Sequence, residues 1–404
     1  MPPFKRAPNA GVDMDIELSS ADLTFREDVI AFLDGNAYKP GEDYAAWRLN
    51  WFKAAAEKGG WDVPKWPTAF GGPGWTPTQH YIWEQETATR NLPWDLPFGV
   101  GMVAPIIMTY GNAEQQARFL PDIRARTVNW CQGYSEPGAG SDLASLKTKA
   151  ELSADGSHYV VNGSKIWTTM AHIADWIFCL TRTSSEGKKQ EGITFLLFPM
   201  KQDGVEVKPI ITLGGSHTVN TVHFTDVKVP VENRIGEEGK GWTYAKGLLA
   251  HERTGLAGVS RSLVALEKLR RQAGKVKRGN GSLLDDANFK SKLARLEIDL
   301  KALEYTELRS LARAASGAEP GPESSIMKLK GTEIQQRIAL LTTEAAGPYA
   351  APWGGASVGP SFAAGGTQSY LGSRAYTIYG GASEVQKDII AKNVLGIRAQ
   401  GTKN

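Results

Sequence analysis

The sequence predicts an α+β fold in which a β domain lies between two helical domains. Near both ends of the chain, apolar residues recur at three- and four-residue spacing, as in amphipathic helices. Between these parts, short runs of β-branched and aromatic residues alternate with Gly, Asp and Ser, as in strands and turns. These changes of pattern place the domains at residues 1–126, 127–235 and 236–404.

The first domain is expected to be helical from its first apolar run. Ser20 is a suitable N-cap for a helix that contains Leu23 and Val29. Residues 81–90 carry charge with apolar spacing and predict a further helix. The stretch between them at residues 66–75 is rich in Gly and Pro, so we expect a loop there.

The middle domain carries the strand patterns. The predicted strands occupy residues 158–161, 193–198, 205–211 and 222–229. A further apolar run at residues 176–180 predicts a buried strand in which Cys179 packs as a small hydrophobic side chain.

Helical spacing returns after the glycine-rich residues 236–241. Residues 289–311 and 326–341 predict helices of several turns that pack against each other. Residues 347–366 are rich in Gly, Ala, Pro and Ser, which is typical of either a linker or a surface loop.

Composition excludes several classes of function. The 404 residues are 41% apolar, which is enough to bury a large core. Lys and Arg total 46 against 43 Asp and Glu, a formal charge of +3, so charge gives no reason to expect a nucleic-acid or anionic-membrane partner. The six His and two Cys show no metal-binding spacing, and we expect no metal.

The cysteine content and the N-terminus bear on location. A secreted protein of this size normally carries more than two cysteines, which favours a reducing compartment. Residues 1–20 contain no apolar core of a signal peptide, and no run approaches the roughly 18 apolar residues of a membrane span. We therefore expect a cytoplasmic protein without a membrane span.

Two segments carry most of the functional information. Residues 134–142 read YSEPGAGSD, so their backbone can turn tightly and offer N–H groups to a polar ligand. Residues 162–169 read NGSKIWTT and end a strand-like run with Trp167 beside two hydroxyls. An indole next to a threonine suits a planar cofactor, because the indole covers one face and the hydroxyl bonds to the edge. For either segment alone, a glycine-rich β-turn and a core tryptophan remain open alternatives.

With two later segments, the chain resembles the acyl-CoA dehydrogenase family over nearly its whole length. The later segments are FTDVKVP at residues 224–230 and IYGGASEVQ at residues 378–386. The resemblance implies a helical N-terminal domain, a middle β-barrel or sandwich and a C-terminal four-helix bundle. It also implies an FAD enzyme that converts an acyl-CoA thioester to the trans-2-enoyl-CoA. Within the family, the chain is most similar to subunits like the pimeloyl-CoA dehydrogenase large subunit and to steroid side-chain dehydrogenases.

The resemblance also assigns cofactor and substrate residues. Trp167 would cover the isoalloxazine, Thr169 would bond near flavin N5, and Ser141 would contact the flavin or the thioester arm. The full set of expected FAD contacts is Gln132, Tyr134, Ser135, Gly140, Ser141, Trp167, Thr169, Ser383 and Glu384. The expected substrate contacts are Ser141, Arg253 and Gly380.

The position of the catalytic base departs from the commonest family pattern. Many members carry a glutamate directly after the Ile-Tyr of the last segment, where this chain has Gly380. A second known location is a glutamate before an arginine early in the first long helix after the β domain, and Glu252 and Arg253 match it. An ordinary helix carboxylate paired with Arg253 is the alternative. Because Gly380 has no side chain but keeps its N–H, we expect Glu252 to remove the α proton and the Gly380 N–H to polarise the thioester carbonyl.

Two expected contacts to a neighbouring subunit's FAD are missing from the sequence. Val276 stands where the family has an arginine for the pyrophosphate, and Thr343 stands near its usual glutamine. The simplest hypothesis is an α2β2 heterotetramer with a paralogous subunit and two flavins, with a homotetramer as the alternative. The resemblance implies an electron-transfer flavoprotein as acceptor. A non-catalytic subunit and a flavin oxidase or monooxygenase of the same fold remain alternatives, and the acyl group stays open.

Overall fold

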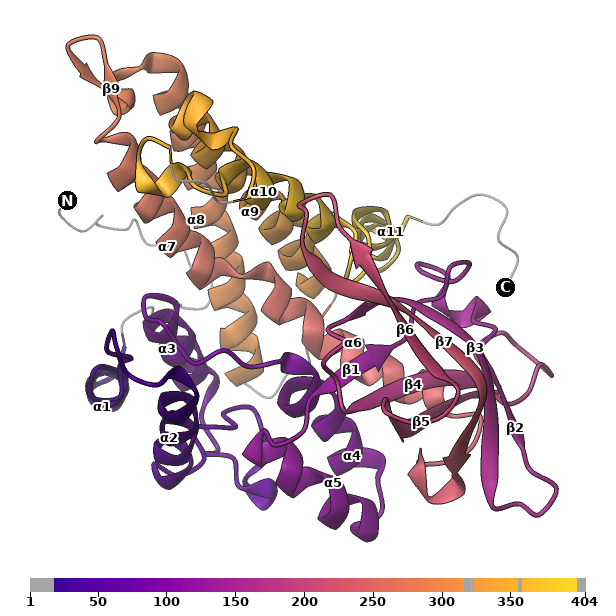
Figure 1. Cartoon of the computed structure of the whole chain (residues 1–404). Helices are drawn as coiled ribbons and strands as arrows, with labels where there is room; N and C mark the ends of the chain where they lie inside the picture. The colour runs from indigo at the N-terminus through magenta and orange to yellow at the C-terminus, as the bar shows by residue number, and fades with distance from the viewer. Residues whose placement is uncertain (1–17, 316–320, 322, 355–357, 398–404) are drawn as a thin grey trace.

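The structure, a computed structural model, describes residues 18–315, 321, 323–354 and 358–397, without the side chains of residues 249–256 and 314–315. Figure 1 shows the β domain on one side of the molecule and the helices α1 to α3 and α7 to α9 on the other. The predicted α+β order of helical, β and helical parts is confirmed.

The N-terminal part consists of short helices around an aromatic cluster. The cluster is formed by Phe32, Trp51, Trp61 and Trp83, which are all buried. The helices are α1 (Ser20–Gly35), α2 (Tyr44–Glu57), α3 (Pro77–Ala88), α4 (Ala104–Tyr110) and α5 (Ala113–Ala125), with the 3₁₀ turn η1 (Thr68–Phe70) and the π-helical segment η2 (Phe98–Val103).

The N-cap of α1 is Ser19, so the prediction of Ser20 was wrong by one residue. The Ser19 hydroxyl accepts a hydrogen bond from the Asp22 N–H, and the Asp22 carboxylate accepts one from the Ser19 N–H. A capping box needs its acidic residue three positions after the cap, and Asp22 stands at that distance from Ser19.

The middle part is one eight-stranded sheet. Its order is β6-β7-β3-β2-β4-β5-β8, and β1 pairs with β4. The strands are β1 (Trp130–Gly133), β2 (Lys149–Leu152), β3 (His158–Thr169), β4 (Trp176–Arg182), β5 (Ile193–Pro199), β6 (Val205–Ile211), β7 (His217–Pro230) and β8 (Arg234–Ile235).

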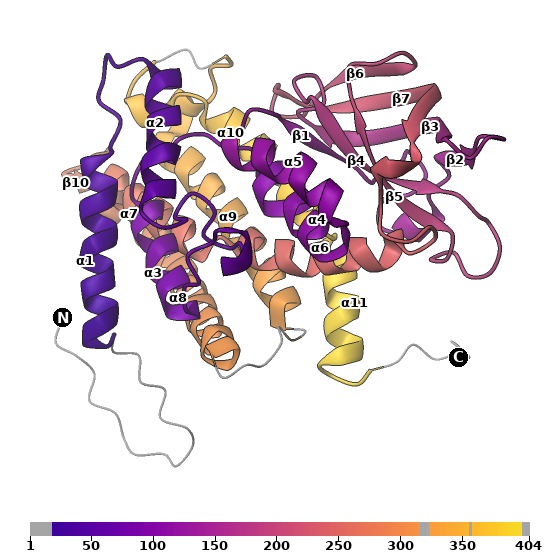
Figure 2. The same ribbon diagram turned by 90° about the horizontal axis from the view of Figure 1, so that it is seen from below.

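Strands β4 and β5 are covered on both faces, which explains their continuous apolar sequence. Cys179 and Phe198 pack in one cluster with residues of β3 and β7, so the predicted burial of Cys179 is confirmed. Phe178 and Phe195 face the other way into a cluster shared with η2, α4, α5 and α6. Figure 2 shows α4, α5 and α6 beside the sheet. The β domain is thereby fixed to both helical parts through one continuous core.

The C-terminal part is a helical bundle around α9. Helix α9 (Glu323–Ala346) packs against α6 (Gly241–Ala257), α7 (Val259–Ala273), α8 (Ala287–Ala315) and α11 (Ser383–Asn393). A Cβ on Gly331 of α9 would lie 2.3 Å from the Ala257 carbonyl oxygen, so the close approach of α6 requires glycine there. The remaining elements are β9 (Lys277–Arg278), β10 (Gly281–Ser282), η5 (Leu283–Asp285), α10 (Gly366–Gly372) and η8 (Ser373–Thr377).

The segment rich in Gly, Ala and Pro folds onto this bundle. It contains the turns η6 (Gly347–Ala350) and η7 (Ser361–Ala363), and Ala350 and Ala363 are buried with Ala346. The Trp353 ring lies against Gly215 in the β6–β7 turn. Over its described residues, the segment is therefore a packed surface loop rather than a linker.

None of the helices in the described residues is both long enough and apolar enough to pass through a bilayer.

Candidate functional site

The first two sequence motifs meet directly in the structure. Residues 134–142 form the loop that follows β1, and residues 162–169 are the last two thirds of β3. The Ile166 N–H donates to the Ser135 carbonyl over 2.9 Å, and Lys165 Nζ donates to the Tyr134 carbonyl over 3.2 Å. The backbone of one motif is thus bonded to the other.

A buried ion pair locks this junction. Lys165 Nζ lies 2.8 Å from Glu136 Oε1, and the Lys165 and Glu136 side chains are 0% and 8% exposed. The Glu136 carboxylate also accepts hydrogen bonds from the Lys147 and Thr148 N–H groups at 2.6 and 2.8 Å. Burial raises the pKa of Glu136, but the charge of Lys165 and these hydrogen bonds outweigh it, so the pKa lies below its ordinary value of 4.5.

Sequence reasoning assigned no role to this pair. Both residues lie inside the two motifs, and a lysine within the strand-forming run at 162–169 is a signal that could have indicated a buried ion pair. Glu136 and Ala139 exchange backbone hydrogen bonds at 3.0 and 3.1 Å across the turn. The alternative of a β-turn is therefore right for the local backbone, and Glu136 connects that turn to β3.

Trp167 is turned out of the sheet. Its side chain is 58% exposed, and its φ of 61° lies in the left-handed region that non-glycine residues rarely occupy. The alternative of a core tryptophan is therefore wrong. An outward indole beside a tight loop is the surface that a planar ring requires on one face.

The other expected FAD contacts surround this junction. Gln132 lies on β1, and its buried Nε2 has no hydrogen-bond partner among the described residues. A Cβ added to Gly140 would meet no atom within 4 Å, so the loop is open at that point. Ser141 is exposed and Thr169 half-buried. The exposed indole, the open loop and the unpartnered amide fit a flat cofactor with polar edges.

The fourth motif forms a tight turn before α11. Gly380 and Gly381 have φ values of 61° and 90°. The buried Lys328 donates from Nζ to the Tyr376 and Gly381 carbonyls over 3.1 and 2.8 Å, which fixes the turn. A Cβ on Gly381 would lie 2.2 Å from Gln386 Nε2. The left-handed backbone at these two positions favours glycine.

The expected contacts of this motif lie just after the turn. Ser383 and Glu384 occupy the first turn of α11, half-buried and exposed respectively. A Cβ on Gly214 in the β6–β7 turn would lie 2.9 Å from the Gln368 carbonyl oxygen, so the β domain touches the neighbouring α10. No hydrogen bond between described residues joins the Gly380 turn to Ser135 or Trp167.

The proposed base lies outside the described side chains. Glu252 and Arg253 belong to α6, whose backbone is described, but nothing is known from the structure about their side chains. The sequence prediction for Glu252 therefore stays a prediction.

The two positions that lack the family's cross-subunit contacts are engaged within the chain. Val276 packs against the C-terminal core, and its carbonyl accepts a hydrogen bond from the Leu283 N–H. The Thr343 hydroxyl donates to the Ala339 carbonyl over 2.9 Å. Neither residue offers a cation.

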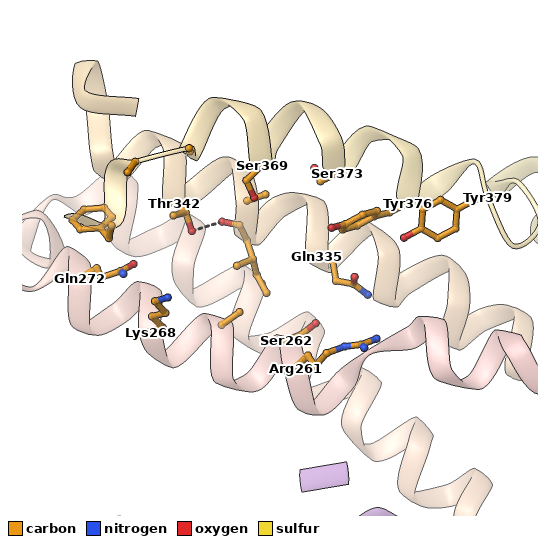
Figure 3. A pocket seen from close by; sticks show the side chains of 17 residues that line it. Arg261, Ser262, Lys268, Gln272, Gln335, Thr342, Ser369, Ser373, Tyr376 and Tyr379 are labelled. Atoms are coloured by element: carbon orange, nitrogen blue, oxygen red, sulfur yellow. Dashed lines mark hydrogen bonds between the residues drawn. The ribbon is translucent and has the colours of Figure 1, made fainter. Parts of the chain in front are cut away.

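A cavity of about 600 Å³ lies between α7, α9, α10 and η8 (Figure 3). Arg261 and Lys268 line it from α7, and Tyr379 reaches it from the turn that contains Gly380. The Ser262 hydroxyl borders it and has no hydrogen-bond partner among the described residues. Among those residues, no cluster of His, Cys, Asp or Glu is suited to a metal ion.

Comparison with known proteins gives a consistent result along the chain. The N-terminal, middle and C-terminal domain models of acyl-CoA dehydrogenases match residues 20–126, 131–227 and 239–395. Acyl-CoA dehydrogenase IpdE1 of Mycobacterium tuberculosis is 34% identical over 89% of this chain and 90% of its own length. Acyl-CoA dehydrogenase FadE26 of the same organism is 36% identical over 84% of this chain and 85% of its own length.

Solved structures agree. The ChsE4-ChsE5 complex from Mycobacterium tuberculosis contains a chain that is 32% identical, with a TM-score of 0.80, covering 96% of this chain and 100% of that one. A structure titled Tcur3481-Tcur3483 steroid ACAD matches with a TM-score of 0.80 and 29% identity over the same shares.

Proposed function

The chain belongs to the acyl-CoA dehydrogenase family and is an FAD-binding acyl-CoA dehydrogenase, and on this premise we propose that it supplies the flavin-ring site and the base of a two-subunit enzyme. The reaction is the α,β-dehydrogenation of an acyl-CoA thioester to the trans-2-enoyl-CoA. The observation that carries the proposal is the outward Trp167, held beside the Ser135 loop by the junction of the two motifs.

The flavin ring has a defined set of proposed contacts. When bound here, FAD would supply the acceptor for the hydride of the β carbon. Trp167 covers one face of the ring and Thr169 bonds to its edge. The remaining proposed contacts are Gln132, Tyr134, Ser135, Gly140 and Ser141 from the β domain and Ser383 and Glu384 from α11.

The proton chemistry falls to Glu252 and Gly380. Gly380 has no side chain that accepts a proton, but its N–H is available to donate to the thioester carbonyl, which acidifies the α carbon. Glu252 then removes the α proton from its position on α6. Arg253 and Ser141 are proposed to contact the substrate.

A paralogous subunit is proposed to supply the cation for the FAD pyrophosphate. Val276 and Thr343 lack a charge and are engaged internally. The two similar structures each combine two named proteins, ChsE4 with ChsE5 and Tcur3481 with Tcur3483. Both points support an α2β2 assembly with two flavins, which passes electrons to an electron-transfer flavoprotein.

A steroid-linked acyl-CoA is the first substrate to test, because one similar structure is titled a steroid ACAD. The panel should also contain straight-chain, branched and dicarboxylic acyl-CoA thioesters with a dye as acceptor. Rapid reoxidation of the reduced flavin by oxygen would instead favour the oxidase alternative.

Flavin content tests the assembly. The chain is purified alone and after co-expression with its paralogue, and FAD per tetramer is measured by absorbance. We expect two FAD per heterotetramer and little FAD in the chain alone. Full FAD occupancy in a homotetramer would refute the two-subunit proposal.

Glu252→Gln tests the base. Loss of a general base lowers turnover by about 10²–10⁴-fold, and we expect FAD content to stay unchanged. Glu267→Gln is the matched control, because Glu267 is a carboxylate on the adjacent helix α7 that pairs only with Arg270 and Arg271 in the described structure. Normal turnover in Glu252→Gln would assign the base elsewhere.

A further inference from the structure

The outward position of Trp167 depends on an irregularity in the sheet. Lys165 pairs with Val222 and Thr168 with Asn220, so three steps along β3 match two along β7. Lys165 is buried, and plain alternation would bury Trp167 as well. The extra residue of this β-bulge reverses the alternation, so that Thr168 is buried and Trp167 faces out.

Asn220 holds the bulge from the opposite strand. Its side chain is 0% exposed, and its Nδ2 donates to the Thr168 carbonyl over 3.0 Å. Its Oδ1 lies 2.7 Å from His217 Nε2, and its Nδ2 lies 3.3 Å from His172 Nδ1. The two imidazole rings stack with centroids 4.1 Å apart.

These contacts fix the orientation of the Asn220 amide and the role of each contacting imidazole nitrogen as donor or acceptor. The Thr168 carbonyl can only accept, so the amide nitrogen of Asn220 must face it. The amide oxygen therefore faces His217, whose Nε2 carries a proton and donates. His172 Nδ1 accepts from the amide nitrogen and carries none. The amide and both rings thus form one connected support behind the bulge.

We propose that Asn220, supported by His172 and His217, is the positioning residue that keeps Trp167 turned toward the flavin ring. The inference rests on the proposed function, in which Trp167 covers that ring. Asn220 itself acts through Trp167 and not on the substrate.

A second bulge in the same strand pair provides the matched control. Between Val161 and Gly163 the register of β3 against β7 shifts again. There Asn162 Nδ2 donates to Asp226 Oδ1 over 3.0 Å, and Asn162 Oδ1 accepts from the Asp226 N–H over 2.9 Å. Asn162→Ala therefore removes an asparagine from a bulge of the same ladder without touching Trp167.

The first test measures FAD affinity and the visible flavin spectrum of the full chain in its FAD-binding assembly. Loss of the bond to a buried carbonyl predicts about tenfold weaker FAD binding and an altered flavin band in Asn220→Ala. Asn162→Ala should leave both unchanged. His217→Gln, which keeps a donor, should retain more affinity than His217→Ala.

A double variant shows whether the effect passes through Trp167. The FAD affinity of Asn220→Ala/Trp167→Ala should equal that of Trp167→Ala, because the two residues act as one unit. Additive losses would overturn the inference, as would an Asn220→Ala affinity no weaker than that of Asn162→Ala. If Trp167→Ala bound FAD as tightly as the wild type, Trp167 would not be a contact of the flavin ring. That result would contradict the proposed function, on which this inference rests.

Thiol labelling gives a readout that needs no flavin. Cys131 and Cys179, the two cysteines of the chain, are both buried, so Trp167→Cys creates an accessible thiol. If the bulge relaxes toward plain alternation, Asn220→Ala should slow labelling of that thiol by about tenfold. An unchanged labelling rate would show that Asn220 is not needed to maintain the bulge.

Discussion

Two glutamates whose carboxylates are removed from solvent have opposite electrostatic surroundings. Glu136 lies in the β domain against the Lys165 cation and two backbone N–H groups, and its pKa is lowered. Glu307 lies on α8 near Glu84 of α3 and Glu304 of α8. Its Oε2 is buried without a hydrogen-bond partner among the described residues.

The surroundings of Glu307 favour its neutral form. Burial raises its pKa to about 7, and the charges of Glu84 and Glu304 add to the shift, while Lys65 opposes it. The same environment raises the pKa of Tyr81 on α3 to about 12, through burial first and then the charges of Glu304 and Glu307. The contact between α3 and α8 therefore contains a carboxyl group whose charge is not compensated when the group ionises above about pH 7.

The two glutamates therefore have opposite effects on the stability of the fold when they are ionised. The ionised Glu136 connects the two motifs that carry the proposed flavin site, whereas the ionised Glu307 opposes the packing of the N-terminal helices on the bundle. A buried charge stabilises a fold only when its partners replace the lost water.

The largest effect is expected from Glu136→Ala. Removing one partner leaves Lys165 buried and unpaired, which should lower the free energy of unfolding by about 3–5 kcal/mol. Denaturant unfolding measures this. Glu151→Ala, which removes an exposed partner of Lys149, should change stability by less than about 1 kcal/mol. Equal losses of stability in the two variants would show that the buried Glu136–Lys165 pair contributes no more than an exposed pair.

Glu307→Gln should stabilise the protein at pH 8 by about 1–3 kcal/mol. The folded-state pKa is raised, so the stability that Glu307 contributes is present below its ordinary pKa of 4.5 and is lost as the pH rises toward about 7. The gain from Gln should therefore vanish at pH 4. Thermal unfolding at both pH values decides this, and a gain that does not depend on pH would contradict the assigned charge state.

Glu136 should show the opposite dependence on pH. Its folded-state pKa is lowered, so its contribution is fully present above the ordinary pKa of 4.5 and is lost as the pH falls through the lower value. The stability difference between the wild type and Glu136→Gln should therefore shrink only below about pH 4.5. A difference that shrinks between pH 5 and pH 7 would argue against the lowered pKa.

The smallest effect is expected from Glu84→Gln. The Lys65–Glu84 pair is exposed, so the direct change in stability should be below about 1 kcal/mol. Removing this charge should lower the folded-state pKa of Glu307. The stability gain from Glu307→Gln should therefore level off at a lower pH and be smaller at pH 8. An unchanged gain at pH 8 would mean that the Glu84 charge does not contribute to the raised Glu307 pKa.

Much of the fold was predictable because its signals are local. Helical spacing and alternating runs gave the order of the three parts, and the apolar run around Cys179 gave a buried strand. Position before the apolar run predicts Ser20 as the N-cap, whereas the reciprocal contact with Asp22 selects Ser19.

The sequence predicted the two motifs of the candidate site but not the contacts that join them. Trp167 was identified by its type and its neighbours, and its outward direction follows from a bulge opposite Asn220, 53 positions further along the chain. Glu136 and Lys165 both lie within the motifs, yet their contact spans 29 positions and cannot be read from either motif alone. Glu252 stays a sequence prediction.

The sequence by itself determined the family, the cofactor class and the absence of a side-chain base at Gly380, because short runs of residue types carry this information. Only the tertiary structure decided which side of β3 Trp167 takes, which of the two glutamates has a cation beside it, and that Val276 is turned to the core. Register, burial and charge pairing depend on segments distant in sequence, and one residue added to a strand reverses the face of every side chain that follows.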